Sequence, residues 1–128
     1  MGIRTLRLLS LVFVLPGPGV ANDLPATEVI DTHAETYVNL QLCSNTYSEY
    51  RNSPQQANLY LDESLKIQKV YMFDEQLLDA FVMAIQRAHD RQGSLVVYPG
   101  ESRGAFYTRV FSESRCEQEL KLASTFRF

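Results

Sequence analysis

His89 and Asp90 are neighbouring residues whose types could support hydrolytic chemistry. A carboxylate next to an imidazole can orient the ring so that it acts as a general base on water. The rest of the chain contains neither a glycine-rich phosphate loop nor a Gly-x-Ser-x-Gly nucleophile motif. A solvated helix end explains His89 adequately. We therefore assign no catalytic residue and keep a small secreted hydrolase using His89 as an alternative.

The second histidine, His33, lies between two acidic residues that could share a metal ion with it. Asp31 and Glu35 are four positions apart and fall on one face of a helix, whereas His33 projects elsewhere. The spacing is not His-Glu-x-x-His, and the acidic pairs at 62–63 and 74–75 lack the ladder of a calcium loop. The sequence therefore predicts no metal site and no cofactor.

The two cysteines, Cys43 and Cys116, lie 73 positions apart. An even pair in an exported chain is most simply a disulfide. No third cysteine or nearby histidine supplies the remaining ligands at zinc spacing. We therefore predict a structural disulfide between Cys43 and Cys116.

The start of the chain has the pattern of a secretory signal peptide. Arg4 and Arg7 precede a largely apolar run at 8–15, and small residues at 19 and 21 form the exit. An uncleaved membrane anchor is the competing interpretation, but the run is short and broken by prolines, whereas a bilayer requires about 20 apolar residues. The sequence predicts cleavage after Ala21 and a single helical domain over 22–128, periplasmic or secreted, without stable membrane insertion.

The charge balance of the chain restricts the kinds of partner that it can bind. The whole sequence has 12 basic and 15 acidic residues, and the predicted leader removes two of the basic ones. Nucleic acids and anionic membranes attract dense clusters of Lys and Arg, which this acidic chain lacks. We therefore expect no nucleic-acid partner.

Hydrophobic periodicity predicts three helices in the first two thirds of the predicted domain. The first runs from near Pro25 to about Arg51, with Cys43 on its apolar seam. The second helix follows a capping box that begins at Ser53, and this helix ends near 69. The third is capped by Asp74 and stops at Gly93, where a left-handed residue is expected.

The segment after Gly93 has two interpretations. Two β-prone runs, 95–98 and 105–111, flank a Pro-Gly segment and are consistent with a short β-hairpin near 95–111. Alternatively, a helix begins near Gly104 and brings Cys116 against the first helix. We favour the helical interpretation, so the sequence predicts a mainly α fold, a small four-helix-type bundle stapled by one disulfide.

Aromatic residues are the unusual feature of the predicted domain. The chain contains seven Tyr and seven Phe but no Trp, and it ends on Phe126-Arg127-Phe128. Tyrosine and phenylalanine supply large contact areas and are enriched at protein interfaces. We expect Tyr98, Phe126 and Phe128 to contact a partner protein of the cell envelope or a secreted protein.

The layout, an exported chain of this size with one disulfide joining an early and a late helix, resembles that of periplasmic helical adaptors. These include secretion-system pilot proteins, immunity proteins and small acid-stress chaperones. The resemblance covers layout and no motif, so it implies no functional residue. It implies a non-enzymatic protein-binding module, such as an adaptor, pilot or immunity protein, with a periplasmic holdase chaperone as a further alternative.

Overall fold

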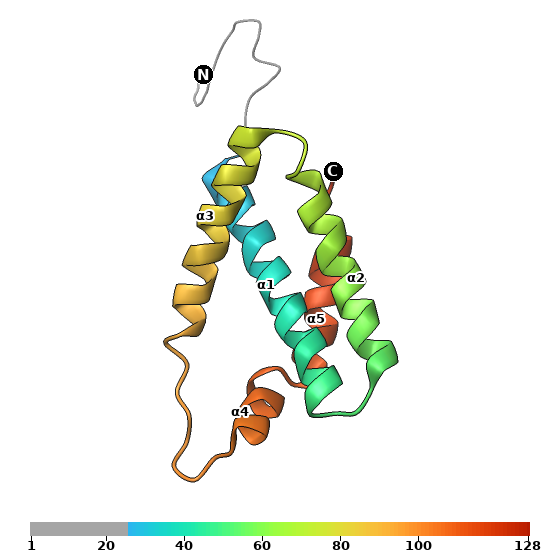
Figure 1. Ribbon diagram of the computed structural model, residues 1–128, viewed down its shortest axis with the longest axis vertical. Helices are drawn as coiled ribbons and strands as arrows, with labels where there is room; N and C mark the ends of the chain where they lie inside the picture. Colours follow the sequence, from blue (N-terminus) through green and yellow to red (C-terminus); the bar gives the residue numbers. More distant parts are fainter. Residues whose placement is uncertain (1–25) are drawn as a thin grey trace, which may run out of the picture.

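The computed structural model describes residues 26–128, so the predicted leader at 1–21 lies outside the described residues. The described chain is mainly helical and has no β-strand, which confirms the predicted mainly α fold. Its five helices are α1 (Thr27–Glu49), α2 (Pro54–Val70), α3 (Glu75–Gln92), α4 (Arg103–Val110) and α5 (Glu113–Ser124) (Figure 1).

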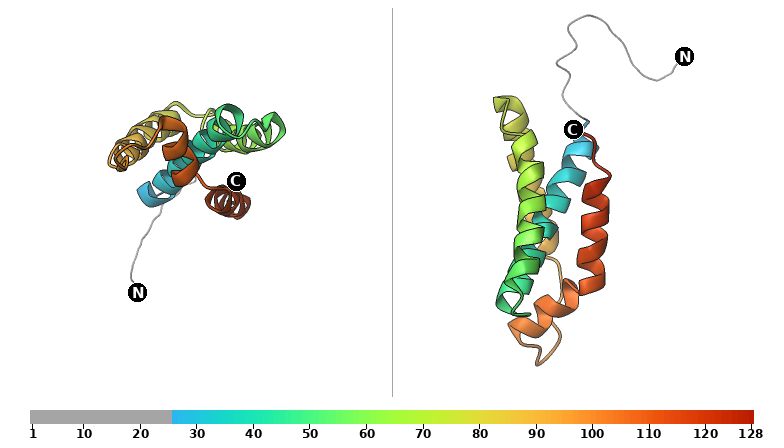
Figure 2. Two further views of the ribbon diagram at one scale, coloured as in Figure 1. Left: turned by 90° about the horizontal axis from the view of Figure 1, so that it is seen from below. Right: turned by 90° about the vertical axis from the view of Figure 1, so that its right-hand side faces the viewer.

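The longest helix, α1, is the centre of the bundle. It packs against each of the other four helices, with α2 and α3 on two sides and α5 on a third (Figure 2). Its buried residues recur at helical spacing and include Ala34, Leu40, Cys43 and Tyr47. Apolar residues at this spacing favour a helix, and the broad buried face that they form is covered by more than one neighbouring helix.

The helices α2 and α3 meet only near the turn that joins them. There the rings of Tyr71 and Phe81 stack with their centres 4.4 Å apart. Farther along, the two helices diverge and make no backbone contact (Figure 1). Ala57 and Tyr60 of α2 are buried, whereas Leu61 and Leu65, whose spacing would also suit the apolar face of a helix, are exposed.

The ends of α2 and α3 test the predicted capping residues. Asp74 caps α3 as predicted, because its Oδ1 accepts a hydrogen bond from Leu77 N at 3.0 Å. Ser53 precedes α2 but makes no side-chain capping bond, so the predicted capping box is wrong and Pro54 begins the helix. Gly93 follows α3 with φ −63°, a right-handed conformation, so the predicted left-handed stop is wrong.

The alternative interpretation, a short β-hairpin near 95–111, does not describe this segment. Residues 95–98 are coil, and the run expected to pair with them forms α4 instead. Ser102 caps that helix by accepting from Ala105 N at 3.1 Å. The predicted helix beginning near Gly104 is correct in type, but it stops at Val110, and Ser112 caps α5 as a separate helix.

The predicted disulfide joins α1 and α5. Cys43 and Cys116 are fully buried and bonded to each other, with their Cα atoms 5.9 Å apart. Because α5 contacts little besides α1, this bond is the covalent link that holds the last helix on the bundle. None of the helices in residues 26–128 combines the length and the apolar composition that crossing a bilayer requires.

Candidate partner-binding surface

The coil between α3 and α4 presents four consecutive apolar or aromatic side chains to solvent. They are Leu95, Val96, Val97 and Tyr98, with exposed fractions of 39%, 67%, 54% and 54%. We call this coil segment together with α4 the α4-end surface. It lies at the end of the bundle opposite the turn between α2 and α3 (Figure 1).

A tight turn reverses the chain immediately after this segment. Glu101 N donates to Tyr98 O at 2.9 Å, and Gly100 has φ +78°. A positive φ at the third position, preceded by proline, is the signature of a type II turn. The Tyr98-Pro99-Gly100-Glu101 sequence therefore fixes the direction in which the coil returns to α4.

A clamp formed by Arg109 and Glu101 holds the exposed coil against α4. Arg109 donates to the Glu101 carboxylate from Nε at 2.7 Å and from Nη2 at 2.9 Å. The same Nη2 donates to Val96 O at 2.9 Å, and Tyr98 N donates to Glu101 Oε1 at 2.9 Å. The Arg109 and Tyr98 hydrogen bonds lower the pKa of Glu101 to about 2. The carboxylate therefore stays ionised at neutral pH.

The Arg109 guanidinium also orders the aromatic side chains of this surface. Its central carbon lies 3.8 Å from the centre of the Tyr98 ring and 5.5 Å from that of Phe106. Both distances are within the range of cation–π attraction. The exposed Tyr98 ring is thus fixed by its neighbours, although it is far from the core.

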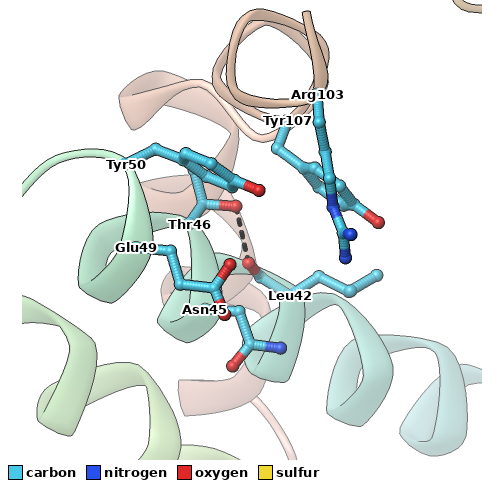
Figure 3. Close-up of a pocket in the computed structure, with 7 residues that line it drawn as sticks. All are labelled: Leu42, Asn45, Thr46, Glu49, Tyr50, Arg103 and Tyr107. Carbon is cyan, nitrogen blue, oxygen red and sulfur yellow. Dashed lines mark hydrogen bonds between the residues drawn. The ribbon is translucent and has the colours of Figure 1, made fainter.

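The helix α4 is attached to the end of α1 by aromatic stacking. The Tyr107 and Tyr50 rings stack with their centres 5.9 Å apart, and Arg103 lies over Tyr107. Figure 3 shows Arg103 and Tyr107 reaching from α4 toward α1, where they line a small pocket. Its volume is about 50 Å³, enough for a few water molecules but far below that of a typical ligand site.

A larger and more apolar pocket lies between α3, α1 and α4. It has a volume of about 220 Å³. Its lining residues are Leu42, His89, Gln92, Gly93, Leu95, Phe106, Tyr107 and Phe111. Leu95 and Phe106 therefore connect this pocket to the α4-end surface. A pocket of this size and composition can accept one apolar side chain.

The largest concavity described, about 460 Å³, lies elsewhere, between the turn after α1 and α5. It is lined by polar residues, among them Arg51, Glu113 and Glu117. The Arg51 guanidinium lies over the Tyr47 ring at 4.8 Å and donates to Thr108 O at 3.1 Å. Arg51 therefore also ties α4 to α1.

The structure places the three predicted partner-binding residues at two opposite ends of the bundle. Tyr98 belongs to the α4-end surface. Phe126 and Phe128 pack beside His33 on α1, with ring centres 4.4 and 5.1 Å from the imidazole. Phe126 is half-buried there, whereas Phe128 remains 63% exposed. The three residues therefore do not form one continuous surface.

His33 itself is a buried residue whose partners are aromatic. Its exposed fraction is 8%, and its Nδ1 is hydrogen-bonded to the Tyr71 hydroxyl. Burial lowers the pKa of His33 and raises that of Tyr71 to about 12. The flanking carboxylates of Asp31 and Glu35 instead pair with arginines of α3.

His89 lies on the last turn of α3 and is exposed. Within residues 26–128, its side chain has no hydrogen bond to a carboxylate, and Asp90 accepts from Gln86 instead. In the same part of the chain, no three His, Cys, Asp or Glu side chains are grouped so that they could hold a metal ion.

Sequence reasoning missed Glu101, Phe106 and Arg109, the residues that organise the α4-end surface. The Pro-Gly pair was a visible signal of the turn. The eight-residue separation of Glu101 and Arg109 matches no local pairing rule, because it depends on how the coil folds back on α4. Comparisons of the chain with models of protein families, with curated proteins and with solved structures found no match.

Proposed function

We propose that this protein is an exported, non-enzymatic protein-binding module whose partner docks on the α4-end surface. The observation that carries the proposal is the Arg109–Glu101 clamp, which fixes an exposed apolar segment that contributes little to the core. An unbound chain gains little from ordering such a segment. A partner gains from it, because less conformational entropy is lost when a preorganised surface binds.

The residue types on this surface support the same proposal. Tyrosine and arginine are, with tryptophan, the residues enriched among those that dominate binding energy at interfaces. The guanidinium carbon of Arg109 lies 3.8 Å from the centre of the Tyr98 ring. The two residues that precede Tyr98 in the chain, Val96 and Val97, are exposed. An aromatic side chain such as Tyr98 next to exposed aliphatic side chains is typical of the centre of a protein interface.

Export is the second part of the proposal and rests on the leader pattern at 1–21. We therefore expect the partner to be another protein of the envelope or a secreted protein. A dedicated adaptor, pilot or immunity role would give one partner, whereas a periplasmic holdase would give many. The hydrolase alternative has less support, because His89 has no hydrogen-bonded carboxylate within residues 26–128.

Photocrosslinking in the native cells tests this proposal. A benzophenone amino acid placed at Val96 should give one discrete adduct with another protein. The matched control carries the same amino acid at Phe73, which is 84% exposed in the turn between α2 and α3 at the opposite end (Figure 1). The proposal predicts an adduct at Val96 that is absent from the control.

Three results would contradict the proposed function. Equal adducts from both positions would show that the α4 end is not a dedicated surface, and a ladder of many adducts would indicate a holdase. The absence of any adduct at Val96, with secretion and disulfide formation intact, would argue against a protein partner at this surface.

A further inference from the structure

A carboxyl group is enclosed between α5 and α1, which run side by side (Figure 2). Glu119 follows Cys116 by three positions, so both residues lie on the face of α5 that packs on α1. Glu119 is partly buried, and its Oε1 is enclosed and has no hydrogen-bond partner among residues 26–128. Such atoms are rare in folded proteins, because they lose their hydration without compensation. An ionised Glu119 is therefore costly to the folded state.

The neighbours of Glu119 compensate its negative charge only in part. Among residues 26–128, no lysine or arginine lies within salt-bridge distance of it. Burial is the largest influence on the pKa of Glu119 and raises it above the ordinary value of 4.5. The Glu35 carboxylate of α1 also raises this pKa, whereas hydrogen bonding to Asn39 of α1 and the charge of Arg115 on α5 lower it. Glu119 therefore keeps its proton to a higher pH than an exposed glutamate does.

A polar cavity of about 230 Å³ lies beside Glu119, between α1 and α5. Its lining residues are Thr32, Glu35, Thr36, Asn39, Glu119 and Leu122. Two of them are also tied to α3, because Arg91 pairs with Glu35 at 3.1 Å and Gln92 donates to Asn39 Oδ1 at 2.8 Å. A small outward movement of α5 would widen this cavity and let water reach the carboxylate. Hydration of the ionised group therefore favours a loosened α5.

The two halves of α5 are held on the bundle by different interactions. The disulfide fixes the first half at Cys116, where the Ser112 hydroxyl also caps the helix. Beyond Glu119, partly buried apolar side chains hold the helix and the tail, among them Leu120, Ala123 and Phe126. The second half can therefore loosen while the disulfide keeps α5 attached to α1.

We propose that Glu119 is a pH-sensitive latch: its carboxyl holds a proton while α5 is seated on α1, and loss of this proton to solvent loosens α5 beyond Cys116. The sign follows from the burial of the carboxyl, since the folded chain binds the proton more tightly than the unfolded chain does. The stabilisation is fully present below about pH 4.5 and is lost as the pH rises through the raised pKa of the folded chain.

Urea unfolding of the oxidised chain between about pH 4.5 and pH 8 tests the latch. E119Q keeps the shape of the side chain but has no carboxyl proton to lose. At about pH 8 its equilibrium constant for folding should be about tenfold larger than that of the wild type, the effect of relieving one unpaired buried group. This difference should vanish toward pH 4.5. The opposite pH dependence of His33 is present in both proteins and cancels in the ratio.

E113Q is the matched control, because Glu113 is an exposed glutamate on the first turn of the same helix. It should not gain stability at about pH 8. Two measurements on the wild type do not depend on how any variant folds. The carbon-13 signal of the Glu119 carboxyl should titrate with a midpoint above 4.5. The amides of 120–123 should open about tenfold more often at pH 8 than at pH 5, after correction for intrinsic exchange rates.

The inference would be overturned by a Glu119 midpoint at or below 4.5, or by a stability ratio of E119Q to wild type that does not change with pH. If the ratio changed but the amides of 120–123 opened equally often at both pH values, ionisation would act on the whole bundle. That result would also overturn a latch in α5. If E119Q did not fold, the two measurements on the wild type would decide.

Discussion

The guanidinium carbon of Arg109 lies 3.8 Å from the centre of the Tyr98 ring, while its nitrogens hold the Glu101 carboxylate. One arginine thus fixes the aromatic ring, the turn after it and, through Val96 O, the coil before it. A long exposed loop would otherwise sample many conformations. This arrangement makes the α4-end surface rigid without burying it.

The substitution E101Q should loosen the coil without unfolding the bundle. Glutamine keeps one acceptor but loses the charge-assisted pairing with Arg109, and hydrogen bonds to charged groups are the stronger ones. We expect the N–H of Tyr98 to exchange about tenfold faster, a typical effect of losing such a bond. E113Q, on α5, is the matched control. Unchanged protection of Tyr98 N–H in E101Q would contradict the clamp.

Acidification should release the same clamp only at very low pH. The folded state holds the pKa of Glu101 at about 2, below its ordinary value of 4.5. The stabilisation is therefore complete above about pH 4.5 and is lost as the pH falls toward 2. The ring proton shifts of Tyr98 should stay constant down to about pH 4 and then change. A change centred near the ordinary value would show that the carboxylate is not clamped.

His33 should make the bundle less stable in mild acid. Burial lowers its folded-state pKa below the ordinary value of 6.5, so the unfolded chain binds a proton first as the pH falls. The free energy of unfolding should therefore decrease as the pH falls below about 6.5. Urea unfolding of H33Q should lack this part of the pH dependence. Identical pH profiles for H33Q and the wild type would show that the lowered pKa of His33 is not the cause of this loss of stability.

Loss of the disulfide should destabilise the fold strongly. The bond closes a loop of 73 residues, for which the chain-entropy model gives about 4 kcal/mol. The double variant C43A/C116A should unfold at a much lower urea concentration than the oxidised chain. Reduction of the wild type should have the same effect, and reductant should not change the variant. Equal midpoints for the oxidised chain and the variant would overturn this prediction.

Gly104 should be required because Tyr50 packs against it. A Cβ added at Gly104 would lie 2.9 Å from Cδ1 of Tyr50, closer than such atoms approach. G104A should therefore lower stability even though alanine favours helices. In a Y50A background the same change should be neutral or stabilising by up to about 1 kcal/mol, the helix preference of alanine. Additive effects in this double-mutant cycle would show that α4 does not dock on Tyr50.

The long helices could be predicted because their patterns are local. Asp74 caps α3 where the sequence places it, and the buried residues of α1 include most of its predicted seam, among them His33, Leu40 and Tyr47. Failures occur where burial depends on neighbouring helices. Leu61 is exposed, whereas Tyr60 beside it is buried, because burial depends on which side of α2 another helix covers, and periodicity within α2 does not contain that information.

The candidate site was only partly predictable for a similar reason. Tyr98 could be selected from the sequence as an aromatic residue in a loop, but the side chain that holds its ring in place is Arg109 of α4. The sequence of α4 is also β-prone, so the helix itself was not the only structure it allowed. The sequence predicts that Phe126 and Phe128 contact a partner protein. Phe126 reaches His33, because the disulfide fixes α5 alongside α1.

The most direct test of the central claim is the affinity of the partner, identified by crosslinking at Val96, for two variants measured side by side. We predict that Y98A binds at least tenfold more weakly, as expected at the centre of an interface, and that F126A/F128A binds like the wild type. Wild-type affinity in Y98A, with binding lost in F126A/F128A, would contradict the claim and assign the interface to the C-terminus.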